Sequence, residues 1–294
     1  MRVSTTTHIF GPTADGGYAP YKESLKRCVD AGFRVLDAHF CQSLYGKTEL
    51  VKDNWQEIME DLRNEAEKLG VVFTQSHPVF ISGHLKQQSE EIQERYREMM
   101  ERSIIASSIL GVKWAVLHPV GALHTEFDTD ANIKESMDIH GFAVELAMKY
   151  NVGIAFENMI EGPNSKRRFC SHAGELAALI DAYNDPRIGA CWDFGHGNFL
   201  YKDQGIALRT LGKRLKALHV NDNDGNGDDH LLPFHGTVKW DKVLPVLAEI
   251  GYEGDFTYEA HKEFVKMPDF LRDQIAKTAY DLGQYCVSVI EGKA

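Results

Sequence analysis

Carboxylate and imidazole side chains follow several apolar, strand-like segments of this 294-residue sequence. They are oxygen and nitrogen ligands, a set that suits Mn²⁺, Zn²⁺, Mg²⁺ or Co²⁺ alike. Ligands that are far apart in the chain can bind one ion if the fold brings the ends of their segments together. The sequence offers nine such candidates: His77, His118, Glu157, Asp193, His196, His219, Asp228, His230 and Glu259.

Taken one at a time, these residues also have ordinary structural roles. His77 and His118 each precede a proline and can be hydrogen-bonded structural histidines. Glu157 can cap the next helix, and Asp228 with His230 can belong to a solvated polar loop. Nine such residues at six strand ends, with no sulfur ligand among them, are difficult to ascribe to packing. We therefore predict a divalent-metal site.

Local spacing adds two expectations about how these side chains are directed. Asp193 and His196 are three residues apart, and Gly195 permits a tight turn, so both side chains can face one ion. Asn158, directly after Glu157, is expected to hold that carboxylate by a hydrogen bond.

The segments that must position these residues alternate between strand-like and helical patterns. Eight β-rich runs are predicted strands: 3–9, 33–38, 71–76, 114–117, 153–156, 188–192, 215–220 and 255–258. Longer amphipathic stretches between them, several opened by Ser, Asp or Asn, are predicted helices: 53–69, 88–110, 132–150, 172–183, 238–250 and 268–289. Four glycines stand between a helix and the next strand, where a left-handed helix cap is expected: Gly32, Gly70, Gly111 and Gly251.

This alternation, with no break in composition, predicts a single (β/α)₈ TIM barrel domain over residues 1–294. In that fold the carboxyl ends of all strands open onto one face, where the candidate ligands would converge. A doubly wound open sheet is the competing fold. It would carry a glycine-rich phosphate loop after its first strand, but 11–17 (GPTADGG) lacks the GxGxxG spacing. We therefore expect no nucleotide cofactor.

Composition excludes other classes of protein. With 32 basic and 43 acidic residues the formal charge is −11, which argues against nucleic acid as a partner. The five cysteines are odd in number and include no CxxC pair, so they are expected to be reduced, mostly buried thiols. The sequence has no apolar signal region and no membrane-length run, which predicts a cytoplasmic protein without a membrane partner. A homo-oligomer is left open.

The order of the candidate ligands, with its DxxH and DxH spacings, resembles the xylose isomerase-like superfamily. This superfamily contains sugar-phosphate isomerases, keto-sugar epimerases and apurinic endonucleases of the endonuclease IV type. The strongest stretch is DHLLPFHGTVKW at 229–240, which is similar to the DHLPPGEGxIDW segment of the isomerase-like members. Phe234 and His235 replace the usual Gly-Glu there. No Arg lies between Arg214 and Arg272, which argues against a typical ketose 3-epimerase.

The resemblance implies two sets of ligands. Four residues would form the metal centre that the superfamily shares: Glu157, Asp193, His219 and Glu259. Five others match the additional ligands with which endonuclease IV holds three zinc ions: His77, His118, His196, Asp228 and His230.

Two enzymatic functions and one non-enzymatic function follow from this resemblance. The preferred one is a divalent-metal-dependent isomerase or epimerase of a sugar, sugar phosphate or polyol derivative. Glu157 and Glu259 would face each other across the substrate as an acid–base pair acting through an enediolate, and His196 would bind a substrate hydroxyl. The alternative is an endonuclease IV-like apurinic endonuclease with a multinuclear zinc site. The third is a barrel that binds metal and sugar without turnover.

One compact basic run bears on the choice of substrate. Lys166, Arg167 and Arg168 can hold the phosphate of a sugar phosphate, or can form a solvated loop. A protein that grips a DNA duplex normally makes several phosphate contacts. A single basic run therefore favours a small-molecule sugar substrate over DNA.

Overall fold

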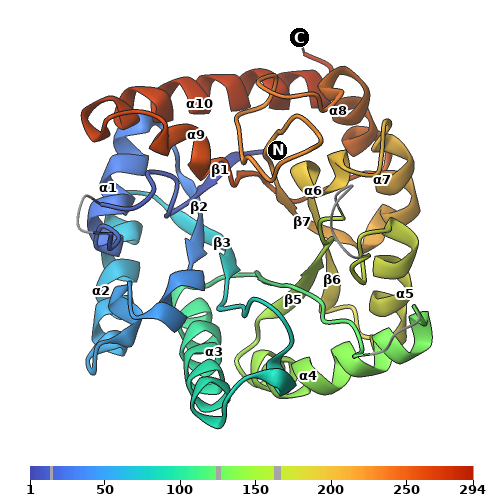
Figure 1. Cartoon of the computed structure of the whole chain (residues 1–294). Coiled ribbons are helices and arrows are strands. Elements are labelled where there is room, and N and C mark those ends of the chain that lie inside the picture. The colour runs from blue at the N-terminus through green and yellow to red at the C-terminus, as the bar shows by residue number, and fades with distance from the viewer. Residues whose placement is uncertain (14–15, 124–126, 162–166, 294) are drawn as a thin grey trace.

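The computed structural model describes residues 1–13, 16–123, 127–161 and 167–293. Eight strands pair in parallel in the order β7-β6-β5-β4-β3-β2-β1-β8. Their bounds are β1 Val3–Thr6, β2 Val35–His39, β3 Val72–His77, β4 Trp114–Leu117, β5 Gly153–Glu157, β6 Ile188–Asp193, β7 Leu215–His219 and β8 Phe256–Tyr258. Figure 1 shows these strands at the centre of the molecule, with the helices around them.

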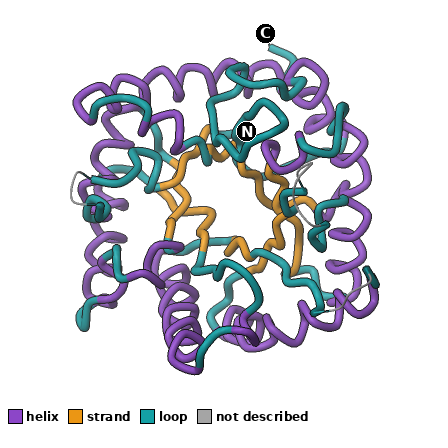
Figure 2. The backbone as a smooth tube through the Cα atoms, viewed as in Figure 1, coloured by secondary structure: helices purple, strands orange, loops and turns teal. Residues whose placement is uncertain are grey.

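The sheet closes between β7 and β8, just beyond the end of β7. The Val220 N–H donates to the carbonyl of Thr257 at 2.7 Å, and the Glu259 N–H donates to the carbonyl of Val220 at 3.1 Å. The strands therefore form a barrel, which Figure 2 shows end-on as a ring inside a ring of helices. This architecture confirms the predicted (β/α)₈ TIM barrel.

The predicted strands match the observed ones within a few residues. The largest difference lies in β1, which ends at Thr6 rather than at residue 9. The chain turns there, because the Ile9 N–H donates to the carbonyl of Thr6 at 3.1 Å and the Gly11 N–H to that of His8 at 2.8 Å. His8 consequently lies in the first loop of the barrel mouth.

Ten helices occur among the described residues: α1 Tyr21–Ala31, α2 Trp55–Lys68, α3 Glu90–Leu110, α4 Thr129–Lys149, α5 Ala173–Tyr183, α6 Phe194–Asn198, α7 Gly205–Leu211, α8 Trp240–Glu249, α9 His261–Val265 and α10 Asp269–Ile290. Six of them were predicted. Helix α1, which begins after Pro20, was not among them. Helices α6 and α9 are five residues long, too short to show a helical period. The expected glycine caps are confirmed, since all four glycines have positive φ.

Two hydrophobic clusters form the core. The larger one lies between the barrel and the helices. The smaller one lies inside the barrel and consists of Val116, Ala155, Cys191 and Ala217, on β4, β5, β6 and β7. Each of these residues stands two positions before a candidate ligand, so it shares the inward-facing side of the strand with that ligand.

The barrel interior is polar on its other side. Gln75 on β3 donates a hydrogen bond to Asp37 on β2 at 3.1 Å, and Thr257 on β8 donates one to Gln75 at 3.3 Å. The floor of the barrel mouth is therefore apolar under β4–β7 and polar under β2, β3 and β8.

Two expectations from composition can be compared with the structure. All five cysteines are buried, free thiols, as expected. Among the described residues, no helix combines the length and the apolarity that crossing a membrane would require.

Candidate metal centre

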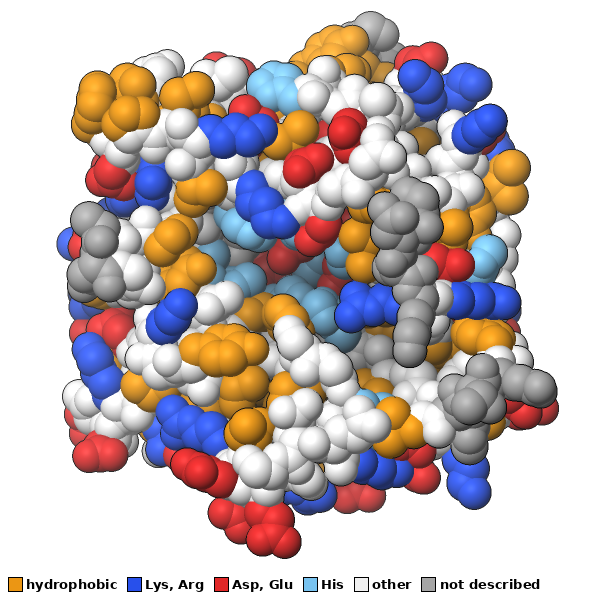
Figure 3. All heavy atoms as spheres, viewed as in Figure 1, with side chains coloured by type: hydrophobic (Ala, Val, Ile, Leu, Met, Phe, Trp, Pro, Cys, Tyr) orange, Lys and Arg blue, Asp and Glu red, His pale blue; other side chains and the backbone are white. Residues whose placement is uncertain are grey.

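The candidate ligands gather in the middle of one face of the barrel, at the carboxyl ends of the strands. Four of them are the last residues of β3, β5, β6 and β7: His77, Glu157, Asp193 and His219. Glu259 comes directly after β8. Figure 3 shows this face, where acidic and histidine side chains line a central hollow. The barrel thus brings together residues that are almost two hundred positions apart in the chain.

One group of four buried ligands can surround a single ion. One ligand atom from each lies within 4.8 Å of the others, and the four residues are Glu157, Asp193, His219 and Glu259. His219 is the link between the two glutamates, because its Nδ1 lies 2.9 Å from Glu157 Oε1 and 3.2 Å from Glu259 Oε2. This is the group that the resemblance implies for the shared centre.

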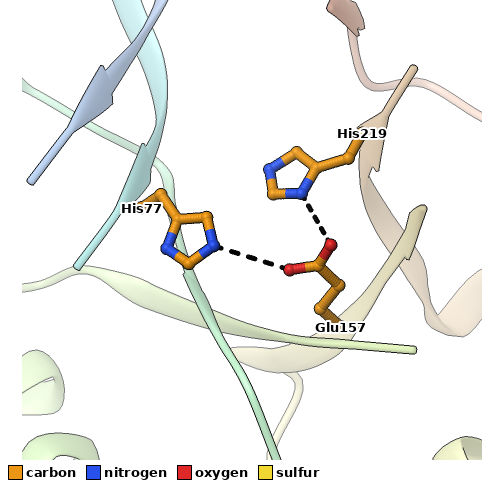
Figure 4. Close-up of side chains that lie close together, drawn as sticks. All are labelled: His77, Glu157 and His219. Atoms are coloured by element: carbon orange, nitrogen blue, oxygen red, sulfur yellow. Dashed lines mark hydrogen bonds and ion pairs between the residues drawn. The ribbon is translucent and has the colours of Figure 1, made fainter. Parts of the chain in front are cut away.

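Glu157 connects this group to two more histidines. Its Oε2 lies 3.1 Å from His118 Nε2 and 3.6 Å from His77 Nε2. Figure 4 shows His77 and His219 approaching different oxygens of the Glu157 carboxylate. Burial alone would raise the pKa of this carboxyl, but the surrounding imidazoles hold its pKa well below the usual range. Glu157 is therefore a carboxylate that can bridge two ion positions.

A further group lies beside α6 and the loop after β7. His196, Asp228 and His230 each offer one ligand atom within 4.8 Å of the others. Asp228 Oδ1 lies 3.1 Å from His230 Nε2 and 3.7 Å from His196 Nε2. Burial opposes protonation of His230, but the Asp228 carboxylate raises the pKa of His230 to about 10. His261, at the start of α9, lies within the same distance of His230 and Glu259.

Backbone carbonyls fix the direction of three imidazoles in these groups. The Nδ1 atoms of His77, His196 and His230 lie 3.0, 2.8 and 2.7 Å from the carbonyls of Pro78, Asn158 and Glu259, respectively. In each ring this contact leaves Nε2 directed at the cluster, as in known metal sites where the second ring nitrogen is hydrogen-bonded. His219 has the opposite orientation, with Nδ1 directed at the cluster.

The residues fit a divalent cation. Two buried oxygens of the candidate ligands, Glu157 Oε2 and Asp228 Oδ1, make no geometrically complete hydrogen bond to the described residues. A buried carboxylate oxygen whose hydrogen bonding is incomplete costs free energy, which a bound cation would offset. Burial also raises the pKa of Asp193 to about 6, and a bound cation would offset this cost of burying its charged form. Oxygen and imidazole donors at these separations match the ligand preferences of Zn²⁺, Mn²⁺ and Co²⁺.

The expectation for Asn158 is wrong. Its side chain does not hold Glu157 but bonds to the backbone of Asp193 on the neighbouring strand. The Asp193 N–H donates to Asn158 Oδ1 at 2.6 Å, and Asn158 Nδ2 donates to the carbonyl of Asp193 at 3.0 Å. Consecutive residues at a strand end point in opposite directions, so Asn158 turns away from Glu157.

Asp193 and His196 lie in different ligand groups rather than facing one position. Asp193 Oδ1 accepts the backbone N–H of His196 at 2.6 Å, which caps α6, and Asp193 Oδ2 accepts from Asn221 at 2.5 Å. The His196 imidazole is instead directed at Asp228. The tight turn predicted at Gly195 is the first turn of this short helix.

The basic run is only partly described. Lys166 lies outside the described residues. Arg167 forms an ion pair with Glu175, and its guanidinium lies 3.7 Å from the ring centroid of Phe127. Arg168 is exposed. The charge of Arg167 is thus already engaged by the protein, while that of Arg168 faces solvent.

The ligands open into a cavity of about 220 Å³. Eight of its lining residues were not predicted: His8, Tyr18, His39, Cys41, Gln42, Phe80, His261 and Lys262. His39 is the last residue of β2, so the strand-end position that marked the other ligands could also have identified it. His8 gave no such signal, because β1 ends two residues before it.

Curated relatives match part of the chain. An uncharacterized protein, y4fM, from Sinorhizobium fredii is 28% identical over 55% of this chain and 51% of its own length. A probable endonuclease 4 from Mesomycoplasma hyopneumoniae is 28% identical over 43% of this chain and 46% of its own length. The chain thus spans about half the length of the curated relatives it matches.

Solved structures match the whole chain at low sequence identity. A D-tagatose 3-epimerase-like protein has a TM-score of 0.74 and 18% identity, covering 100% of this chain and 99% of its own. The IOLI protein, solved with a zinc atom, has a TM-score of 0.76 and 18% identity, covering 99% of both chains. These likenesses support the fold. The family model of the xylose isomerase-like TIM barrel matches residues 25–279, and the chain therefore belongs to the xylose isomerase-like TIM barrel family.

Proposed function

We propose that this protein is a divalent-metal-dependent isomerase or epimerase of a sugar or a related polyol. The observation that carries the proposal is the convergence of the Glu157 and Glu259 carboxylates on His219 at the floor of a cavity. Paired carboxylates beside an ion position are suited to moving a proton next to a carbonyl group. The epimerase-like protein and the IOLI protein among the structural neighbours agree with this proposal at the level of the fold.

Glu157, Asp193, His219 and Glu259 would hold the ion. When bound, the ion would polarise adjacent carbonyl and hydroxyl oxygens of the substrate and make the neighbouring C–H more acidic. Asp193 is held for this task from two sides, by the His196 backbone and by the Asn221 amide. These bonds fix the carboxylate before the ion arrives.

The two glutamates would move the proton. His219 holds the pKa of Glu259 below its usual value although burial opposes this, so Glu259, like Glu157, is an ionised group able to accept a proton at neutral pH. Glu259 would take the proton from the substrate carbon, and the electron pair of the C–H bond would move toward the carbonyl oxygen to give an enediolate. Return of that proton by Glu259 to the adjacent carbon gives isomerisation, with the hydroxyl proton of the first carbon passing to the former carbonyl oxygen so that a new carbonyl forms on the first carbon. Epimerisation would instead need a proton on the opposite face of the same carbon, which Glu157 would relay from solvent while Glu259 keeps the proton that it removed.

His196 would hold a substrate hydroxyl. Its Nδ1 is fixed by the carbonyl of Asn158, so Nε2 is the nitrogen that faces the cavity. A hydroxyl bound there would orient the sugar over the two glutamates, because a fixed ring nitrogen offers a hydrogen bond in one direction.

Exchange with solvent tests this proposal. In D₂O the metal-loaded protein is expected to place deuterium on the carbon beside the carbonyl of a ketose, a ketose phosphate or an inosose. Glu259→Gln should slow this exchange at least about 100-fold, since an amide cannot accept the proton. Glu263→Gln, the same change four residues along the chain, is the matched control and should exchange normally. Metal analysis of both variants separates loss of the base from loss of the ion.

Endonuclease activity is the second candidate, and a specific observation favours it. Residues that match all nine ligand positions of the multinuclear type are present, and the two oxygens of Glu157 face different histidines, so this carboxylate would be able to bind two ions. A probable endonuclease 4 is among the curated relatives, although the match covers 43% of this chain. Nicking of an abasic-site oligonucleotide, with three zinc ions per chain and no exchange in any sugar, would overturn the isomerase proposal. Sugar binding with neither exchange nor nicking would indicate a barrel without turnover.

A further inference from the structure

Asp37 is a buried carboxylate inside the barrel that the proposed mechanism does not use. It lies in the middle of β2 and is 1% exposed. Its Oδ1 has no hydrogen-bond partner among the described residues. An ionisable group without a complete set of partners is costly at such a depth, so its presence there calls for a role.

A β-bulge in β3 sets Gln75 opposite Asp37. The register between β2 and β3 shifts between Leu36 and Asp37, where Leu36 pairs with Phe73 and Asp37 pairs with Gln75. Bulges commonly redirect a side chain next to an active site. Leu36 packs in the core between barrel and helices, whereas the Asp37 carboxylate lies within the barrel.

The carboxylate is also held by one hydrogen bond from Gln75 on the neighbouring strand β3, which in turn bonds to β7 and β8. Gln75 Nε2 donates to Asp37 Oδ2 at 3.1 Å and lies 3.3 Å from the carbonyl of Leu218 on β7. Thr257 on β8 in turn holds Gln75 Oε1 at 3.3 Å. Asp37 is therefore tied to three other strands, including the one that carries His219.

The group in front of Asp37 is His219. The His219 Nε2 lies 3.7 Å from Asp37 Oδ2, while its Nδ1 faces Glu157 and Glu259. The three ligand histidines fixed by backbone carbonyls use Nδ1 for that contact and direct Nε2 at the cluster. His219 is reversed relative to them, so the proton that fixes its tautomer belongs on Nε2, on the side of Asp37.

We propose that Asp37 is a positioning residue for the metal ligand His219. Its charge lies 3.7 Å from Nε2 of His219 and so favours the tautomer that carries the proton on Nε2 and leaves the Nδ1 lone pair facing the ion. The other fixed histidines meet a neutral carbonyl, whereas His219 meets a carboxylate, which makes its Nδ1 a more basic ligand. This inference rests on the proposed metal dependence and extends it to a residue below the ligands.

Metal affinity, measured without any substrate, tests the role of Asp37. The affinity for Zn²⁺ is measured by competition with a chelator in the wild type, Asp37→Asn and Asp37→Leu. Outer carboxylate partners of ligand histidines typically contribute about 10- to 100-fold in metal affinity. The Zn²⁺ affinity of Asp37→Leu should fall by this factor. Asp37→Asn should lose less, because its amide oxygen can still accept the Nε2–H.

Asp255→Asn is the matched control. Asp255 is also a buried carboxylate next to a barrel strand, but it bonds to Arg2 and Thr74 and contacts none of the candidate ligands. This variant should bind zinc like the wild type. Equal affinity in the wild type and both Asp37 variants would overturn the inference alone, whereas a wild type that binds no ion would overturn the proposed function as well.

A second test of the role of Asp37 uses only the wild type, so its result does not depend on whether a variant folds. Long-range ¹H–¹⁵N spectra of the zinc-loaded protein report which ring nitrogen carries the proton. His219 should show a protonated Nε2 and a metal-bound Nδ1, the reverse of His196 and His230. A His219 that binds zinc through Nε2, or carries its proton on Nδ1, would overturn the role of Asp37 whatever the affinities.

Discussion

The two halves of the barrel mouth hold their histidines in different ways. From β3 to β8, the rings of His77, His196 and His230 are each fixed by a carbonyl at 2.7–3.0 Å, so one nitrogen points at an ion position. On the side of β1 and β2, His8 and His39 lie in ring contact at 4.0 Å, and neither imidazole hydrogen-bonds to any described residue. Both still line the cavity.

The difference between fixed and unfixed histidines indicates that the two halves have different roles. A metal ion needs ligand lone pairs at fixed positions, and a hydrogen bond at one ring nitrogen fixes the direction of the lone pair on the other. A free imidazole offers a donor and an acceptor together, which matches the hydroxyl groups of a sugar. Burial lowers the pKa of His8 and of His39 well below the usual range, so both rings are neutral at neutral pH. We expect the fixed half to hold the ion and the unfixed half to contact the substrate.

Loss of a ligand in the fixed half should have the largest effect. Asp193→Ala removes one of four ligands and should abolish stoichiometric metal binding. This effect is larger than the loss of about 10- to 100-fold in metal affinity that follows removal of a residue hydrogen-bonded to a ligand. The barrel should remain folded, because strand-end residues on this face serve function more than stability. Elemental analysis and circular dichroism measure the two effects, with Asp224→Ala, at an exposed acid of the loop after β7, as the control. Unchanged metal content would refute the four-ligand assignment.

A third kind of histidine sets a limit to the comparison, because it is fixed but lies outside the cavity. His140 on α4 is buried, and its Nε2 lies 2.9 Å from the carbonyl of His118. Burial lowers the pKa of His140 to about 4, against about 6.5 in the unfolded chain. Above pH about 6.5 this shift does not reduce the free energy of unfolding. As the pH falls from there toward 4, the shift lowers the free energy of unfolding by at most about 3 kcal/mol.

Replacement of His140 should remove that part of the acid sensitivity. Between pH 7 and pH 4.5, metal-free His140→Gln should lose less unfolding free energy than the metal-free wild type, by about 2 kcal/mol. Urea unfolding at both pH values measures the difference, in which the other histidines cancel. An equal loss in both proteins would mean that His140 is not held neutral by burial.

The sequence predicted those features of the fold and the site that depend on residue periodicity and on position within a strand. Alternation of apolar residues gave the eight strands, and strand-end positions gave Glu157, Asp193 and His219 as neighbours. It did not predict the direction of side chains, because this depends on pairing between strands. The bulge that sets Gln75 opposite Asp37 and the bonds of Asn158 to β6 are properties of the register, which no single strand encodes.

The contacts of the unfixed half were missed for a different reason. His8 lies in a loop after β1, and its neighbour Tyr18 comes from the segment before α1, stacked on it at 3.8 Å between ring centroids. Loops carry no period from which their approach could be predicted. A strand-end position also identifies only acids and histidines that would bind an ion. It gives no weight to histidines whose partner would be the substrate.

The smallest expected effect tests the unfixed half directly. His8→Phe and His39→Phe keep a planar ring and remove both ring nitrogens, so each should weaken binding of a true substrate about 5- to 10-fold, the worth of one or two lost hydrogen bonds. The bound metal should be unchanged, since neither residue belongs to a ligand group. His235→Phe, at an exposed histidine, is the control. The loss should shrink for shorter sugars that lack the hydroxyls farthest from the carbonyl, because those hydroxyls would lie farthest from the ion. Loss of metal in either variant, or an equal loss for sugars of every length, would show that the two halves do not divide ion and substrate between them.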